Sequence, residues 1–158
     1  FVIPNPWDIG TARILTALGF EALATTSSGF GYANGRPDRA TELTRDGVLA
    51  NAAAIVAATD LPVSADLLNG FGADPADCAE TIHRAVDIGL VGGSIEDATG
   101  DETDPIFPFD LAVARVAAAS EAARGQPFLL TARAENFFSG RPDLDDTIRR
   151  LQAFAEAG

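Results

Sequence analysis

With 158 residues, the chain is long enough to bury a sizeable core in one domain. Its 47% hydrophobic and 22% charged residues exclude a disordered chain, and no apolar run reaches the roughly 20 residues of a membrane helix, so we expect no membrane partner. The formal net charge of −12 argues against a nucleic-acid partner, because phosphate binding requires a basic surface.

Five short apolar segments run along the chain, and each is followed by a helical pattern. The predicted strands are residues 1–4, 22–26, 62–66, 91–95 and 128–132. The predicted helices, which have i, i+3, i+4 apolar spacing, are residues 8–18, 45–59, 75–88, 109–124 and 144–157. Glycines at positions 19, 89 and 125 follow three of these helices, as residues that end a helix commonly do.

The strands are continuous apolar runs, which are typical of parallel strands covered on both faces. Repeated strand–helix units leave two architectures, an open doubly wound sheet or a closed β/α barrel. Polar residues follow all five strands, and only a barrel collects every strand end on one face. The sequence therefore favours an α/β fold in which residues 1–158 form a truncated TIM-type β/α barrel catalytic domain of about five units. A complete small sheet of five strands is the alternative.

The single cysteine, Cys78, excludes an internal disulfide, and nothing points to an oxidising compartment. The first residues lack the pattern of a secretory signal, so we expect a cytoplasmic protein. The chain has no methionine, including at position 1, and we expect it to be a piece of a longer protein.

Acidic residues follow two neighbouring predicted strands. Asp66 follows the third strand, and Glu96 and Asp97 follow the fourth. Carboxylates are hard oxygen ligands, and Mg²⁺ needs only one or two of them because it keeps several waters. We therefore predict a magnesium site at Asp66 and Glu96, with helix-capping acids in short loops as the alternative.

Arg133 follows the fifth predicted strand, in the stretch TARAENF. Its planar guanidinium is suited to hold a carboxylate or phosphate with two hydrogen bonds. Glu135 could orient this guanidinium, although the spacing of two residues leads us to expect a turn between them. The alternative is a structural ion pair at the mouth of the barrel.

A long loop is predicted after the second strand. Ser27, Ser28 and Gly29 offer hydroxyls and successive backbone N–H groups, which suit an anionic group. Long loops often act as lids, and Asp38 at the end of this one could reach the site on closure. A plain flexible loop is the alternative.

Five stretches, in order, resemble the isocitrate lyase/phosphoenolpyruvate mutase superfamily. They are PNPWDIGTARILTALGFEALATTSSG, NGRPD, PVSADLLNGFG, GGSIEDATG and TARAENF. The resemblance implies an α/β barrel that binds Mg²⁺ and a small carboxylate substrate, a 2-oxo acid or its enolate, and that breaks or forms a C–C or P–C bond beside it. It also implies a homo-oligomer, because helix swapping between subunits is common in the family.

The resemblance also implies roles for single residues. Asp66 and Glu96 match the metal shell, Arg133 matches the substrate-clamping arginine, and Asp38 matches the gating-loop aspartate. Asp38 and Arg133 are therefore the predicted catalytic residues. The predicted substrate-binding residues are Trp7, Ser27, Ser28, Gly29, Phe30, Arg133 and Glu135.

Three departures from the family pattern limit the reaction. Leu68 stands where the family usually has a second acid, and the adjacent Asn69 is expected to point elsewhere. The residues after Glu96, DATGDETDPIFPFD, contain neither the cysteine motif of the lyases nor the lysine of the mutases. The sequence therefore predicts a lyase or phosphonomutase-like enzyme of this superfamily acting on a small 2-oxo or 2-hydroxy acid. A barrel that binds a carboxylate without catalysis is the alternative.

Overall fold

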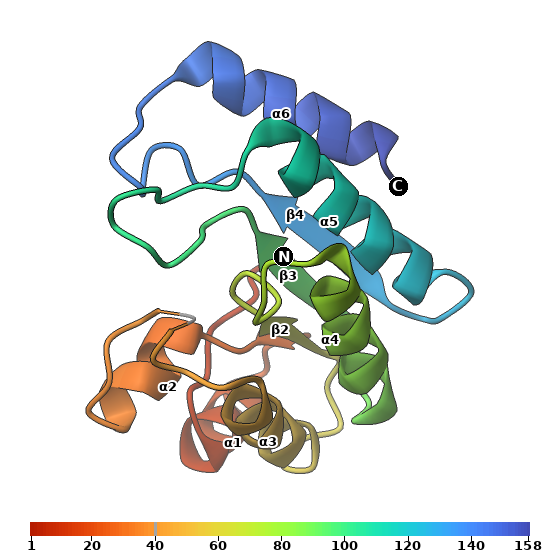
Figure 1. Cartoon of the computed structure of the whole chain (residues 1–158). Coiled ribbons are helices and arrows are strands. Elements are labelled where there is room, and N and C mark those ends of the chain that lie inside the picture. Colours follow the sequence, from red (N-terminus) through yellow and green to blue (C-terminus); the bar gives the residue numbers. More distant parts are fainter. Residues whose placement is uncertain (40) are drawn as a thin grey trace.

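The computed structural model describes residues 1–39 and 41–158. Within these residues four parallel strands form one sheet in the order β1-β2-β3-β4 (Figure 1). The strands are β1 (Leu23–Ala24), β2 (Val63–Asp66), β3 (Gly92–Glu96) and β4 (Leu129–Arg133). The strands are adjacent in the order of the chain, as in a β/α barrel, whereas the strand order of a doubly wound sheet reverses at a switch point. The predicted truncated barrel is therefore confirmed, and no small five-stranded sheet is seen in the described residues.

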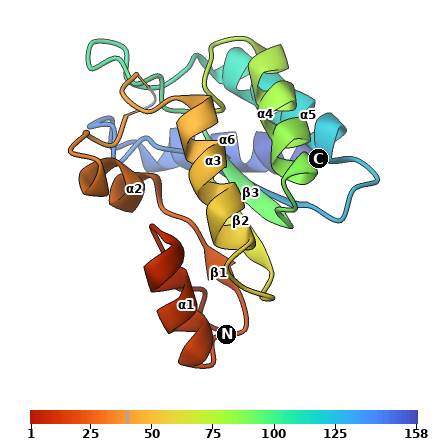
Figure 2. The same cartoon turned by 90° about the horizontal axis from the view of Figure 1, so that it is seen from below.

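Helices connect the strands and follow one another around the sheet (Figures 1 and 2). They are α1 (Ile9–Ala17), α2 (Ser27–Ala33), α3 (Arg45–Val56), α4 (Pro75–Asp87), α5 (Phe109–Ala123) and α6 (Leu144–Glu156). All except α2 were predicted, with ends that differ by at most three residues. Asp8 caps α1 by accepting a hydrogen bond from the Thr11 amide at 2.7 Å, and Asp143 caps α6 in the same way. No helix in the described part of the chain is long and apolar enough to cross a membrane.

Two predictions near the N-terminus are wrong. Residues 1–4 do not form a strand, because only the Pro4 carbonyl takes part in backbone pairing, accepting a hydrogen bond from Ala24 at 3.1 Å. The stretch predicted as a loop begins with α2, whose first turn is capped by the Thr26 hydroxyl. The side chain of Phe30 in α2 packs against Leu43 and Val48, and this apolar contact stabilises a short helix that contains two glycines.

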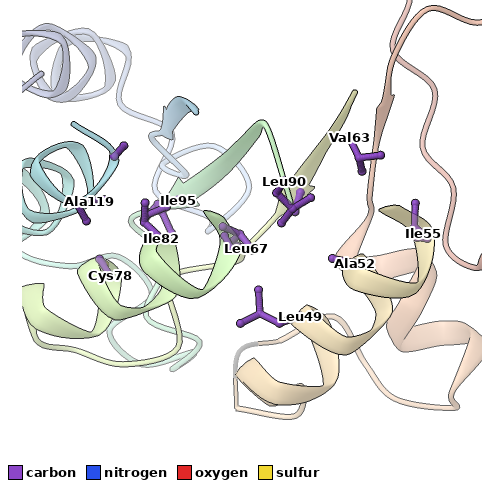
Figure 3. Packing of buried hydrophobic residues seen from close by; sticks show 14 of the residues in the cluster. Leu49, Ala52, Ile55, Val63, Leu67, Cys78, Ile82, Leu90, Ile95 and Ala119 are labelled. Carbon is purple, nitrogen blue, oxygen red and sulfur yellow. The ribbon is translucent and has the colours of Figure 1, made fainter. Parts of the chain in front are cut away.

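The core lies between the sheet and helices α1, α3, α4 and α5 (Figure 3). Leu67, Ile82 and Ile95 are among its largest side chains, and Cys78 is completely buried. Coverage on both faces is not observed in β4, where Leu129 is 75% exposed. The core thus fixes the outer side of the sheet and leaves the ends of β2, β3 and β4 to form the site.

Candidate functional site

The last residues of three neighbouring strands meet in one cavity of about 310 Å³. Asp66 ends β2, Glu96 ends β3 and Arg133 ends β4, and Glu96 pairs directly with Arg133 in the parallel register. Carboxyl ends of parallel strands lie at one edge of the sheet, which explains why residues far apart in sequence converge. The other residues that line the cavity are Ser27, Asp38, Arg39, Leu68, Asn69, Ala98, Gly100, Glu135 and Phe138.

The guanidinium of Arg133 lies among three carboxylates. Its nitrogens are 3.6 Å from Asp66 Oδ1, 3.4 Å from Glu96 Oε2 and 2.7 Å from Glu135 Oε1. Its Nε also donates to Glu135 Oε1 at 2.9 Å, so Glu135 holds the guanidinium along one edge. The expected turn between Arg133 and Glu135 is absent, because the intervening backbone is neither turn nor bend. Arg133 is 37% exposed, so part of the guanidinium stays open to the cavity.

Burial raises the pKa of Glu96 to about 8, against the opposing attraction of Arg133. The nearby carboxylates of Glu135, Asp66 and Asp38 raise this pKa further. Burial would lower the pKa of Arg133, but the surrounding carboxylates raise it overall. The site therefore holds a permanent positive charge beside a carboxyl group that exchanges its proton near neutral pH.

Asp66 is oriented by neighbouring polar groups. Its Oδ2 accepts hydrogen bonds from the Ser27 hydroxyl at 2.6 Å and from the Ser27 amide at 3.2 Å. Its Oδ1 accepts a hydrogen bond from the Leu68 amide at 3.3 Å. Two anchored oxygens fix the direction of the carboxylate, so Ser27 both lines the cavity and orients Asp66.

Asp38 lines the same cavity as the residues at the strand ends. Burial raises its pKa, while the Ser27 hydroxyl lowers it and the charge of Asp66 raises it. The neighbouring Arg39 forms an ion pair with Glu102 at 2.6 Å, which links this segment to the loop after β3. Asp38 and Asp66 therefore line the same cavity, and the catalytic role of Asp38 stays a prediction.

Four of the predicted substrate-binding residues do not line this cavity. Of the segment from residue 27 to 30, only Ser27 does, because the rest is folded into the first turn of α2. The amides of Gly29 and Phe30 are used by Thr26, and the Ser28 hydroxyl lies 3.0 Å from the Thr26 hydroxyl. The fourth is Trp7, which is 43% exposed beside Gly29.

The loop after β2 forms another wall of the cavity. Leu68 has a positive φ of 50° and is 4% exposed, packed with Leu43 and Val48. Asn69 also contributes to the lining of the cavity, but its side-chain amide bonds to the backbone of Phe71 and Thr99 rather than to Asp66 or Glu96.

Phe138, Ala98 and Arg39 also line the cavity and were not predicted. Phe138 follows β4 in the stretch ENFFSG and is 92% exposed. An exposed aromatic side chain just beyond a strand end is the signal that could have identified it. Ala98 and Arg39 carry no such signal.

The donor set in the cavity fits a magnesium ion with two protein ligands. Asp66 and Glu96 approach the same guanidinium within 3.6 Å, so their carboxylates lie on the same side of the molecule. In residues 1–39 and 41–158 no group of three or more His, Cys, Asp or Glu side chains could hold a metal. Two carboxylates suffice for Mg²⁺ when water and substrate oxygens complete its shell.

Comparisons with known proteins agree with the fold. The family model for phosphoenolpyruvate phosphomutase matches residues 1–158. A Mycobacterium tuberculosis protein without a described function is 31% identical over 160 residues, covering 100% of this chain and 58% of that protein. The chain spans about half the length of the curated relatives it matches.

Two crystal structures share the fold closely. One, from Burkholderia cenocepacia J2315, is described provisionally as a lyase/mutase; it has a TM-score of 0.94 and 57% identity, over 100% of this chain and 56% of that chain. The other is phosphonopyruvate hydrolase in complex with oxalate and Mg²⁺, with a TM-score of 0.88 and 25% identity, over 100% of this chain and 55% of that chain. With the match along the whole chain, these findings show that residues 1–158 belong to the phosphoenolpyruvate phosphomutase family of the isocitrate lyase/phosphoenolpyruvate mutase superfamily.

Proposed function

We propose that the protein is a Mg²⁺-assisted lyase or phosphonomutase-like enzyme that acts on a small 2-oxo or 2-hydroxy carboxylic acid through an enolate. The observation that carries the proposal is the meeting of Asp66, Glu96 and Arg133 in one cavity. A fixed positive charge beside two hard oxygen ligands suits a substrate that is both an anion and a metal ligand.

Arg133 binds the substrate carboxylate through the part of its guanidinium that faces the cavity. Glu135 holds the guanidinium through Nε and through the Nη2 atom at 2.7 Å, so the direction of the guanidinium is set before substrate arrives. A bound carboxylate would compete with Asp66 and Glu96 for Arg133, since both contacts, at 3.6 and 3.4 Å, are longer than a good hydrogen bond. Substrate binding would therefore free these two carboxylates for the metal.

Asp66 and Glu96 would hold Mg²⁺, which supplies a Lewis acid that stabilises negative charge on the enolate oxygen. Ser27 keeps Asp66 aimed into the cavity through its hydroxyl and its amide. Asp38 lines the cavity, where it can position substrate, and the segment that carries it would exclude water from the reactive enolate. The phosphonopyruvate hydrolase relative, which binds oxalate and Mg²⁺, supports this assignment.

The test is thermal unfolding of the full-length protein with Mg²⁺ and oxalate, which resembles a pyruvate enolate. We expect a saturable rise of several degrees in melting temperature, because a ligand that binds only the folded state stabilises it. Arg133→Ala should abolish the rise, whereas Arg141→Ala should keep it, since Arg141 is 53% exposed and lies outside this cavity. A folded wild-type protein that shows no rise would overturn the proposal.

One observation favours a second candidate, a catalytically impaired barrel that binds a small carboxylate as a binding or regulatory protein. Leu68 is packed into an apolar cluster where the family usually has a second acid. Such a protein would bind oxalate yet convert none of a panel of short 2-oxo and 2-hydroxy acids. Turnover of any member of the panel would exclude this candidate. Homo-oligomerisation and a cytoplasmic location remain predictions for both candidates.

A further inference from the structure

Asp97, the residue after β3, is a buried acid that does not line the cavity. It is 3% exposed, and all of its polar groups are engaged. Its amide donates to the Arg133 carbonyl at 3.2 Å, and its carbonyl accepts from the Phe107 amide at 2.8 Å. Its Oδ1 accepts from the Glu135 amide at 2.8 Å, and its Oδ2 accepts from Arg150 at 3.0 Å.

Two of these bonds hold the backbone that carries the clamp. The Asp97 amide donates to the carbonyl of Arg133, and the Asp97 carboxylate accepts from the amide of Glu135. These two groups belong to the peptide bonds on either side of Ala134. Residues 134 and 135 lie beyond the end of β4, so the ladder of the sheet does not fix them. The placement of the Glu135 carboxylate against Arg133 therefore depends on Asp97.

Asp97 is itself held in place by α6. Arg150 on this helix donates to Asp97 Oδ2 and to the Phe107 carbonyl, and its Nε donates to Asp146 at 2.7 Å. Asp97 and Arg150 are 2% and 7% exposed at their side chains, so the pair is shielded from solvent. A buried charge with matched partners occupies one position rather than several, which suits a support for a precise contact.

We propose that Asp97 is a positioning residue for the Arg133 clamp and that Arg150 keeps Asp97 in place. The inference rests on the proposed function, in which Arg133 binds the substrate carboxylate. Asp97 does not line the cavity of the proposed site, so it would act through Glu135 and Arg133. Hydrogen-bond partners that orient metal ligands commonly contribute about 10- to 100-fold to affinity or activity, and we expect the lower end of this range for a partner that orients Arg133.

The central experiment follows the Nε–H resonance of Arg133 by NMR in the ligand-free, full-length protein, with Arg133→Lys used to assign it. In Asp97→Asn the new amide cannot accept from both Glu135 and Arg150, so one of the two bonds is lost. We expect the Arg133 Nε–H to exchange with water about tenfold faster and oxalate affinity to fall about tenfold. An unchanged Arg133 signal in folded Asp97→Asn would overturn the proposal.

Asp146→Asn is the matched control, because it removes a carboxylate from the same network without touching residues 133–135. It should leave the Arg133 signal as in wild type, and an equal change in both variants would show that Asp97 acts only on stability, against the proposal. If Asp97→Asn does not fold, Arg150→Lys is the second variant, because it keeps a positive charge beside Asp97. It should also speed the exchange of the Arg133 Nε–H with water, by less than about tenfold. An unchanged exchange rate of the Arg133 Nε–H in folded Arg150→Lys would then overturn the role of Arg150.

The two proposals fail in different ways. If wild-type protein does not bind oxalate, the proposed function fails, while the Arg133 signal still tests whether Asp97 orients the guanidinium. If wild type binds oxalate and Asp97→Asn binds it equally well despite a displaced Arg133 signal, the proposed function stands and the positioning role is overturned.

Discussion

The carboxyl group of Glu96 lies deep in the cavity, with its side chain 14% exposed, and this burial raises its pKa to about 8. The ordinary value of 4.5 applies in the unfolded chain. Between these two values the folded protein binds a proton that the unfolded protein has released. The contribution of Glu96 to stability is therefore complete below pH 4.5 and is lost as the pH rises to about 8.

We predict that the free energy of unfolding of the metal-free protein falls between pH 4.5 and about pH 8, by up to about 1.4 kcal/mol per pH unit. Glu96→Gln, which cannot ionise, should flatten this dependence. Urea unfolding at several pH values measures the pH dependence of the free energy of unfolding. Mg²⁺ should also weaken this dependence, because the cation favours the ionised carboxylate of Glu96. Parallel curves for wild type and Glu96→Gln would show that Glu96 does not titrate in this range.

Leu68 is the second informative residue, because it stands where the family usually has a second acid and has a positive φ of 50°. Leu68→Asp should raise Mg²⁺ affinity roughly tenfold, since an added carboxylate strengthens a site for a hard cation. It should also lower the free energy of unfolding by about 2 kcal/mol, because a polar group replaces a packed leucine. Calorimetric titration with Mg²⁺ and urea unfolding measure the two effects.

Leu68→Asn is the control for this substitution. Asparagine tolerates a positive φ as aspartate does and should cost similar stability, but it adds no charge. Equal Mg²⁺ affinities in the two variants would show that position 68 does not face the metal.

At the scale of elements, side chains from three helices donate hydrogen bonds to backbone carbonyls of the loop after β2. Arg115 of α5 donates to the carbonyls of Gly72 at 2.6 Å and Ala73 at 2.7 Å, and also to that of Asn69. Arg45 of α3 and Thr81 of α4 both donate to the Gly70 carbonyl. These bonds satisfy carbonyls that the irregular backbone leaves without partners, so the wall of the cavity is rigid without regular structure.

Arg115→Met should therefore destabilise the protein by about 3 kcal/mol or more, because several buried carbonyls lose their donor. Arg124→Met, at the end of the same helix, should change stability by less than about 0.5 kcal/mol, since its ion pair with Glu121 is exposed. Urea unfolding compares the two variants. Similar losses would mean that Arg115 does not hold the loop.

The sequence predicted elements where a local pattern determines them. Apolar spacing and the glycines that end helices identified five helices, and parallel strand ends identified Asp66, Glu96 and Arg133 as neighbours. Helix α2 was missed because two glycines weaken its helix propensity, while its stability comes from packing against α3. The pair of Asp97 and Arg150 was missed because 53 residues separate them and no spacing rule relates them.

At the scale of the whole molecule, the described strands form one arc of parallel sheet, with helices following one another along it (Figure 1). The site lies at the carboxyl edge of this sheet. The proposed clamp and both proposed metal ligands come from consecutive strands of this arc. Their mutual placement therefore depends on strand register, which the parallel ladder fixes: Asp66 lies opposite Ser94, and Glu96 lies opposite Arg133.

The most direct test is a crystal structure of the full-length protein grown with Mg²⁺ and oxalate. The account predicts one cation in the cavity, bound by Asp66 and Glu96 at about 2.1 Å or through its waters, with an oxalate carboxylate on Arg133. Oxalate bound away from Arg133, or a cation that contacts neither Asp66 nor Glu96, would contradict it.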